Sequence, residues 1–275
     1  MTPEFIFFAD LVLLPRLRLL LSDAPVSGTR WLCKGMVEVI ALCLFEPHPF
    51  LLGAGLSILA LNFAAGYWDR RSFDRNGGRL FLGMLQLAIL SFWFSPGGGV
   101  QFRSQITVWG DWLVTWSALG SEARELFGQT GLKMLLGLLL SANEANLLVR
   151  WLLGRLQIKP SSGAAIINVT IDAGEYNRGR VIGLLERALI YAFVLSGQFG
   201  AIGFTLAAKG FTRFKEMENR GFAEYVLIGT LLSSSIAMAT GVWINRVIHR
   251  PSAYGFSQLR MILPLRPDPI RSKAV

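Results

Sequence analysis

The chain has 275 residues, of which 52% are apolar and 16% charged, and its mean hydropathy is +0.46. Soluble domains carry closer to a quarter charged residues, so the composition argues against an ordinary soluble domain and indicates a multi-pass membrane protein. The formal charge of +9 does not indicate nucleic-acid binding. Lys and Arg stand in short clusters beside apolar runs, where they anchor spans, and no basic groove motif with interleaved aromatic residues accompanies them.

Residues 1–22 are apolar but contain Asp10, Pro15, Arg16 and Arg18. Proline interrupts a helix, and arginine resists burial in lipid. We therefore expect this segment to form an amphipathic helix at the membrane interface and not to cross the bilayer.

Several apolar runs then approach the length of about 20 residues that a transmembrane helix needs. In the first of them Lys34 and Glu38 are spaced i, i+4 and can pair. The basic loop 69–79 favours the cytoplasmic side, which predicts that both termini are cytoplasmic. The segment 31–45 is short for a span, and the Trp-rich segment 105–119 is either an interfacial or re-entrant helix or a half-buried helix. Because both segments are ambiguous, five or seven spans stay open. The six predicted spans are 31–45, 50–68, 80–94, 132–153, 184–208 and 222–247.

The predicted fold class is all-α, a polytopic transmembrane helical bundle of about six spans with interfacial amphipathic helices. We divide it into an N-terminal membrane region (1–130), a C-terminal membrane domain (131–248) and a basic cytoplasmic tail (249–275).

Polar residues inside two predicted spans indicate a buried polar centre. Glu144 lies in mid-span, where a carboxylate must be paired, protonated or hydrated. The stretch is therefore a site for a proton, ion or substrate, or an interhelical pair such as one with Arg187, or it lies at the surface because the span is misplaced. Glu186 and Arg187 are adjacent and cannot face each other on a helix, which favours an anchor and an interhelical partner. The expected centre comprises Asn143, Glu144, Asn146, Arg150, Glu186, Arg187 and Gln198.

Small residues recur at helical spacing in the last two predicted spans. Such stripes let helices in lipid approach closely, so we expect these spans to pack on each other or on symmetry mates. The first stripe is Ser196, Gly200, Gly203 and Ala207, and the second is Gly229, Ser233, Ala237 and Gly241.

A charged segment, 209–220, separates these two spans. It is either a short helix in the membrane surface, where Lys209, Arg213 and Lys215 meet lipid phosphate or a partner, or a solvated loop with ordinary anchors. Six spans would place this basic segment outside, against the positive-inside bias. A helix break among the glycines of the stretch 197–203 would return the segment to the inside.

The sequence contains no recognisable motif for metal binding, cofactor binding or catalysis. Cys33, Cys43, His48 and His249 are not at metal-ligand spacing, and no glycine-rich phosphate loop occurs. We therefore expect no metal and no cofactor, and a non-enzymatic role is favoured.

The C-terminal part carries one specific pattern. It comprises NLLVRWLL at 146–153, GRVIGLLER at 179–187, GQ at 197–198, AIGF at 201–204, AAK at 207–209, RF at 213–214 and EYVLIGTLLS at 224–233. This pattern closely resembles the C-terminal signature of a family of uncharacterised bacterial integral membrane proteins. The resemblance implies the bacterial inner membrane but no reaction, and residues 1–130 lie outside it.

These observations favour a channel- or transporter-like component, or a membrane subunit of a larger assembly. The expected partners are anionic membrane lipids and either other membrane subunits or further copies of the chain, but not nucleic acid. An intramembrane enzyme acting on lipid, with Glu144 or Glu186 as general base, and a scaffold built on the small-residue stripes both stay open.

Overall fold

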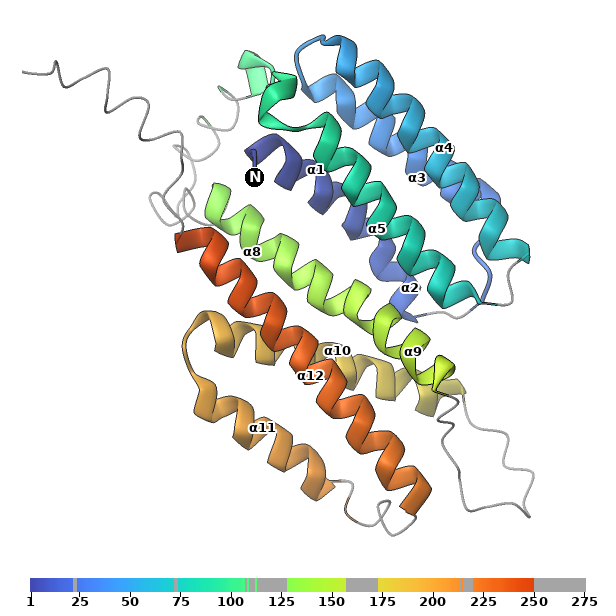
Figure 1. The fold of residues 1–275 in the computed structure, drawn as a ribbon, viewed down its shortest axis with the longest axis vertical. Coiled ribbons are helices and arrows are strands. Elements are labelled where there is room, and N and C mark those ends of the chain that lie inside the picture. Colours follow the sequence, from blue (N-terminus) through green and yellow to red (C-terminus); the bar gives the residue numbers. More distant parts are fainter. Residues whose placement is uncertain are drawn as a thin grey trace, which may run out of the picture.

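The structure is a computed structural model in which long α-helices lie side by side (Figure 1). It describes residues 1–21, 24–71, 74–106, 108, 112, 128–156, 173–212, 214 and 220–249. Within these ranges the elements are helical, and an isolated bridge joins Phe45 to Phe102. The predicted all-α class is confirmed. The expected Trp-rich helix at 105–119 falls mostly outside the described residues, and the expected tail falls outside them beyond His249.

The longer elements run along a common direction (Figure 1). Helices η1, η2 and η3 are short 3₁₀ turns, and η4 is a π-helical turn that joins α8 to α9. The elements are α1 (Pro3–Leu13), η1 (Leu14–Leu17), α2 (Arg18–Leu21), α3 (Gly28–Ala41), η2 (Leu42–Leu44), α4 (Pro49–Arg71), α5 (Arg75–Trp93), η3 (Pro96–Gly98), α8 (Gln129–Leu139), η4 (Leu140–Glu144), α9 (Ala145–Arg155), α10 (Ala173–Leu195), α11 (Phe199–Thr212) and α12 (Arg220–His249).

Three helical segments in the described part are long and apolar enough to cross a membrane: Pro49–Arg71, Gln129–Arg155 and Ala223–His249. The sequence predicts six. The outward surface of these segments is apolar, with Leu52, Leu56 and Phe63 on α4 being 75%, 71% and 65% exposed. Charged side chains, in contrast, are buried between the helices. Large exposed apolar faces around a charged interior reverse the pattern of a soluble domain and suit a lipid environment.

Helix α1 lies inside the bundle, which corrects the prediction of an interfacial helix at 1–22. Its two faces are covered by different helices. Ile6, Ala9 and Leu13 pack on α8, whereas Phe8 and Val12 pack on a core built from α3, α4 and α5. A helix whose apolar residues lie all around it is buried on all sides, and Arg16, one of the charges that argued against burial, is paired by another helix, as described below.

The predicted span 184–208 is not one helix. It breaks at Gly197, whose φ of +69° lies in the left-handed region that glycine adopts without steric cost. Helix α10 ends at Leu195, and α11 returns beside it as the second arm of a hairpin (Figure 1). The break falls at the first of the glycines that the sequence offers for it.

The basic loop 69–79 and the two described ends of the chain lie at opposite ends of the bundle (Figure 1). At one end the Thr2 hydroxyl donates to the Phe94 carbonyl (3.0 Å), and α12 ends beside the start of α8. At the other, Trp151 Nε1 donates to the Asp74 carboxylate (3.1 Å). The shared side predicted for the termini is therefore not found for the start of the chain or for His249, because α1–α2 and the α10–α11 hairpin each add a passage along the bundle. The tail beyond His249 lies outside the described residues.

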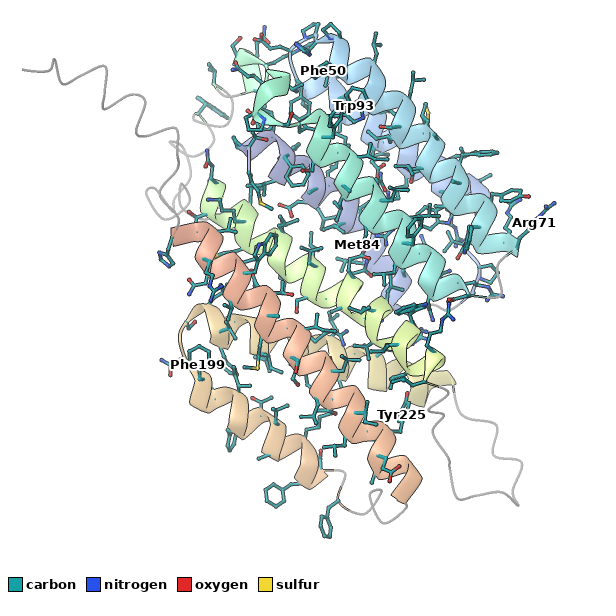
Figure 2. The ribbon with its side chains drawn as sticks, viewed as in Figure 1. Phe50, Arg71, Met84, Trp93, Phe199 and Tyr225 are labelled. Carbon is teal, nitrogen blue, oxygen red and sulfur yellow. The ribbon has the colours of Figure 1, made fainter. Side chains whose placement is uncertain are left out.

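We call the end where α4 meets α5 the basic end. Helix α4 finishes at Arg71, α5 begins at Arg75 and α9 finishes at Arg155. Figure 2 shows Arg71 projecting from this end, whereas Phe50 and Trp93 lie together at the opposite end, with ring centroids 5.7 Å apart. Helix α11 also finishes, at Thr212, toward the basic end (Figure 1).

Candidate functional site

The first ion pair of the interior joins Arg16 to Glu144, which are 128 residues apart. Arg16 Nε donates to Glu144 Oε1 (2.7 Å) and Nη2 donates to Oε2 (3.0 Å), a bidentate arrangement between side chains that are 2% and 6% exposed. Arg16 Nη2 also donates to the Arg79 carbonyl (2.8 Å). Such a forked pair satisfies both groups and holds them in one geometry.

Local backbone features present both partners. Pro15 lies in the 3₁₀ turn η1, which interrupts the rod formed by α1 and α2, and Arg16 follows it directly. Glu144 closes the π-helical turn η4, a feature that proteins often place at functional sites. Gly83 of α5 makes room for the guanidinium, since a Cβ there would lie 2.3 Å from Arg16 Nη2.

A second polar cluster joins α3, α4 and α5. The predicted Lys34–Glu38 pair is present, with side chains that are 8% and 1% exposed. Asn62 Nδ2 and Gln86 Nε2 each donate to Glu38 Oε2 at 2.8 Å. Lys34 Nζ also reaches the amide oxygens of Asn62 (3.2 Å) and Gln86 (3.4 Å). The Glu38 carboxylate is therefore held by one side chain from each of the three helices.

A third ion pair closes the basic end. Arg79 Nε donates to Asp69 Oδ1 (2.7 Å) and Nη2 to Oδ2 (3.0 Å), and these side chains are 2% and 1% exposed. The same groups hold the connection before α3, because the Val26 amide donates to Asp69 Oδ2 (2.6 Å) and Arg79 Nη2 donates to the Ala24 carbonyl (2.9 Å). We refer to the three pairs and their amide partners as the buried charge network.

Asp10 differs from these carboxylates. It is 3% exposed, and neither of its carboxylate oxygens has a hydrogen-bond partner among the described residues. It lies on α1, six residues before Arg16, which corresponds to about 9 Å along a helix axis. The interior of the bundle thus holds one carboxylate that the surrounding side chains do not neutralise.

The predicted polar centre is only partly assembled. Asn143 Nδ2 donates to Glu144 Oε1 (2.8 Å), so these two residues do lie together. Asn146 and Arg150 are half-buried and lie further along α9. Arg187 is buried but does not pair with Glu144; it donates to the Ala142 carbonyl (3.2 Å) and approaches the Ser233 hydroxyl (3.3 Å).

Two further members of that centre lie elsewhere. Glu186 pairs with Lys209 of α11, and both side chains remain about one-fifth exposed, at 20% and 19%. Gln198 is exposed in the turn between α10 and α11. The break at Gly197 explains this position, since it turns the chain at the end of the bundle just where a continuous helix would have kept Gln198 inside.

The two small-residue stripes have different surroundings. On α12, Ala237 is fully buried, and a Cβ at Gly241 would lie 2.8 Å from Val194 of α10. Gly229 and Ser233 of the same stripe are half-buried, beside Leu153 and Arg187 respectively. The second stripe therefore faces the helices that pack on α12.

The first stripe does not pack on α12, which corrects that part of the prediction. Its members Ser196, Gly200, Gly203 and Ala207 are exposed, and a Cβ at Gly200 or Gly203 would meet nothing within 4 Å. Packing of this stripe on a second copy stays a prediction. Of the predicted basic contacts, Lys209 is half-buried in its pair with Glu186, whereas Arg213 and Lys215 lie outside the described residues.

Sequence reasoning missed Asp10, Arg16, Asp69 and Arg79 as interior residues. One signal was available: each interrupts or borders an apolar run, as Glu144 does. In the described part, no group of three or more His, Cys, Asp or Glu side chains is arranged to hold a metal ion.

Comparison of the chain with protein-family models, with curated proteins and with solved structures finds no match. The resemblance to a bacterial membrane-protein family therefore stays a prediction.

Proposed function

We propose that the chain is a multi-pass protein of the bacterial inner membrane that acts as a transporter- or channel-like component, alone or within a larger assembly, and that its interior carries a proton or small cation. The observation that supports this proposal is Asp10, a carboxylate buried without a partner among the described residues. In an apolar interior such a group must take up a proton, bind a cation or meet water. A purely structural role would not require a carboxylate there.

The buried charge network supports the same role. From Asp10, ionisable groups continue along the bundle through Arg16 and Glu144 to Arg79 and Asp69 at the basic end. Series of ionisable residues inside membrane proteins mark proton and ion pathways. In this proposal Asp10 is the loading group, and the Arg16–Glu144 pair opens to pass the charge.

The rival role, an enzyme that uses a buried glutamate as general base, finds less support. Glu144 is occupied by Arg16 and Asn143, and Glu186 is occupied by Lys209. A carboxylate whose oxygens are already bound by a cation is not free to take a proton from a substrate.

In the proposed membrane arrangement, α3, α5 and α10 cross beside the three candidate spans, and α1–α2 and α11 carry the chain between the same two ends. We place the basic end in the cytoplasm because of its arginines. Single cysteines at Gly97 and Gly179, where a side chain would meet nothing within 4 Å, report the two ends. In a background without the native cysteines, a membrane-impermeant maleimide applied to whole cells should label the cysteine at 97 and not that at 179. The reverse result would contradict this orientation.

Transport is tested in proteoliposomes that contain a pH-sensitive dye. We expect a proton or cation flux that falls at least tenfold in Asp10→Asn and in Glu144→Gln. Glu4→Gln is the matched control, because it makes the same chemical change on the same helix at a half-buried position. Equal flux in the parent protein and in Asp10→Asn would rule out Asp10 as the carrier of charge.

A further inference from the structure

A pocket of about 380 Å³ opens between η1–α2 and the first half of α3. Four of its lining residues are basic: Arg16, Arg18, Arg30 and Lys34. None of the described residues that line it is acidic, and the others are largely apolar, including Leu19, Val26 and Trp31. The volume is within the range of about 300–1,000 Å³ in which proteins hold small ligands.

The four cations are not equivalent. Arg16 and Lys34, at the inner side, are neutralised by Glu144 and Glu38 of the buried charge network. Arg18 and Arg30 are exposed, and neither makes a hydrogen bond or ion pair with the residues that the structure describes. The pocket therefore presents two uncompensated guanidinium groups beside an apolar wall. Guanidinium groups bind phosphate through paired, charge-assisted hydrogen bonds.

An apolar track leads away from the pocket along α3. Cys33 and Val37 line the pocket, and Ile40 continues the same helical face at i+7. Val37 and Ile40 are 54% and 63% exposed, although both are aliphatic. A headgroup anion in the pocket would thus have an exposed apolar surface for its acyl chain directly beside it.

We propose that this pocket binds an acidic phospholipid, with Arg18 and Arg30 holding the phosphate and the Cys33–Val37–Ile40 face of α3 holding the upper part of one acyl chain. The proposal rests on the membrane location given above but not on transport. A soluble phosphate could use the two arginines but not the apolar wall, which favours the lipid.

A native cysteine in the pocket allows lipid binding to be measured. Cys33 lines the pocket and is exposed, whereas Cys43 lies in η2 and is also exposed but lies outside the pocket lining. The full chain in a mild non-ionic detergent is treated with a maleimide, and modification of each cysteine is followed by peptide mass spectrometry. We expect phosphatidylglycerol to slow the labelling of Cys33 at least fivefold and to leave the labelling of Cys43 unchanged. Phosphatidylcholine and inorganic phosphate, added separately, should leave both rates unchanged.

Variants separate the two arginines from general electrostatic attraction. Arg18→Gln/Arg30→Gln should abolish the protection of Cys33 by phosphatidylglycerol. The matched control, Arg71→Gln/Arg155→Gln, removes two exposed arginines from the same end of the bundle and should keep it. A circular-dichroism spectrum equal to that of the parent checks that the fold of each variant is intact.

Several results would overturn the proposal. Equal protection by phosphatidylcholine would show that the phosphate charge is not selected, and protection by inorganic phosphate would assign the pocket to a soluble anion. Loss of protection in both double variants would show that the net positive charge of the protein, and not Arg18 and Arg30 in particular, attracts the lipid. Asp10→Asn should leave the protection intact, so a failed flux experiment and a failed lipid experiment remain distinguishable.

Discussion

Two regions of the bundle are held together by different means. Helices α1 to α5 and α8–α9 are joined by buried ion pairs with few alternative geometries, as in the forked Arg16–Glu144 contact. Helices α10 and α12 are joined mainly by apolar side chains packed closely over small residues, as where Val194 meets Gly241. Both kinds of contact hold helices together in lipid. No water is present to replace the polar contacts, and small residues permit close van der Waals contact.

The difference also concerns how much each region can move. A buried ion pair tolerates little displacement unless a proton or cation takes the place of one partner, because opening it otherwise leaves a charge without solvation. Helix α11 makes few buried contacts. Ile202 is its one buried residue, and Phe204 and Phe211 are 77% and 81% exposed. Few buried contacts mean low local stability. We expect the first region to set the geometry of the interior and α11 to adjust to its surroundings.

The largest effect is expected when one partner of the Arg16–Glu144 pair is removed, which tests whether this ion pair stabilises the first region. Arg16→Met should lower the free energy of unfolding by about 3–5 kcal/mol, because Glu144 is then buried without a counter-charge. Denaturation in mixed detergent micelles, followed by circular dichroism, measures the change. The double variant Arg16→Met/Glu144→Leu should recover most of the loss. A single variant as stable as the parent would show that the pair does not hold the region.

The second region is tested by filling its close contact. Gly241→Leu should cost about 3 kcal/mol, since even a Cβ there lies 2.8 Å from the buried Val194. Gly200→Leu is the matched control from the other stripe and should change stability by no more than about 0.5 kcal/mol. If Gly200→Leu instead dissociates an oligomer in size-exclusion chromatography with light scattering, the α11 stripe is an interface between copies.

A smaller effect on the first region is expected when a methyl group is added at a glycine that contacts the ion pair. Gly83→Ala places a methyl group 2.3 Å from Arg16 Nη2 and should cost about 1–2 kcal/mol, because the guanidinium is held by Glu144 and cannot move aside freely. Gly154→Ala on α9, where a Cβ meets nothing within 4 Å, should stabilise the protein by up to about 1 kcal/mol. The same denaturation series compares the two, and equal effects would contradict the tight packing at Gly83.

The smallest effect is expected at the partly exposed pair between α10 and α11. Lys209→Gln should cost about 1 kcal/mol or less, because one-fifth of each side chain remains exposed and solvent screens the pair. Hydrogen exchange of the α11 amides should rise in this variant while exchange in α1 and α8 stays unchanged. A global rise in exchange would show that α11 is as firmly integrated as the first region.

The sequence predicts those features that depend on neighbours along one helix. The all-helical class, the Lys34–Glu38 pair and a helix break among the central glycines follow from composition, i, i+4 spacing and backbone freedom. Glu144 also stands out, because a carboxylate inside an apolar run needs an explanation.

Its partner does not follow from the sequence. Arg16 is 128 residues away, and helical spacing carries no information about which distant helix lies alongside. The sequence does not predict the burial of Asp69 and Arg79 for a related reason. Both residues lie in a basic loop whose charges suit cytoplasmic anchors, and only the packing of the 24–26 connection over α4 and α5 encloses them.

The burial of α1 has a consequence for biosynthesis. This helix leaves the ribosome before the helices that enclose it, yet the contacts of its flanking residues reach Phe94 and Glu144, which are made 92 and 128 residues after Thr2 and Arg16 respectively. Until those residues emerge, Asp10 and Arg16 carry charges that lipid does not accept. Helix α1 therefore has to wait at the membrane surface or beside the insertion machinery, and a segment that is translated before its partners is among the last to reach its final position.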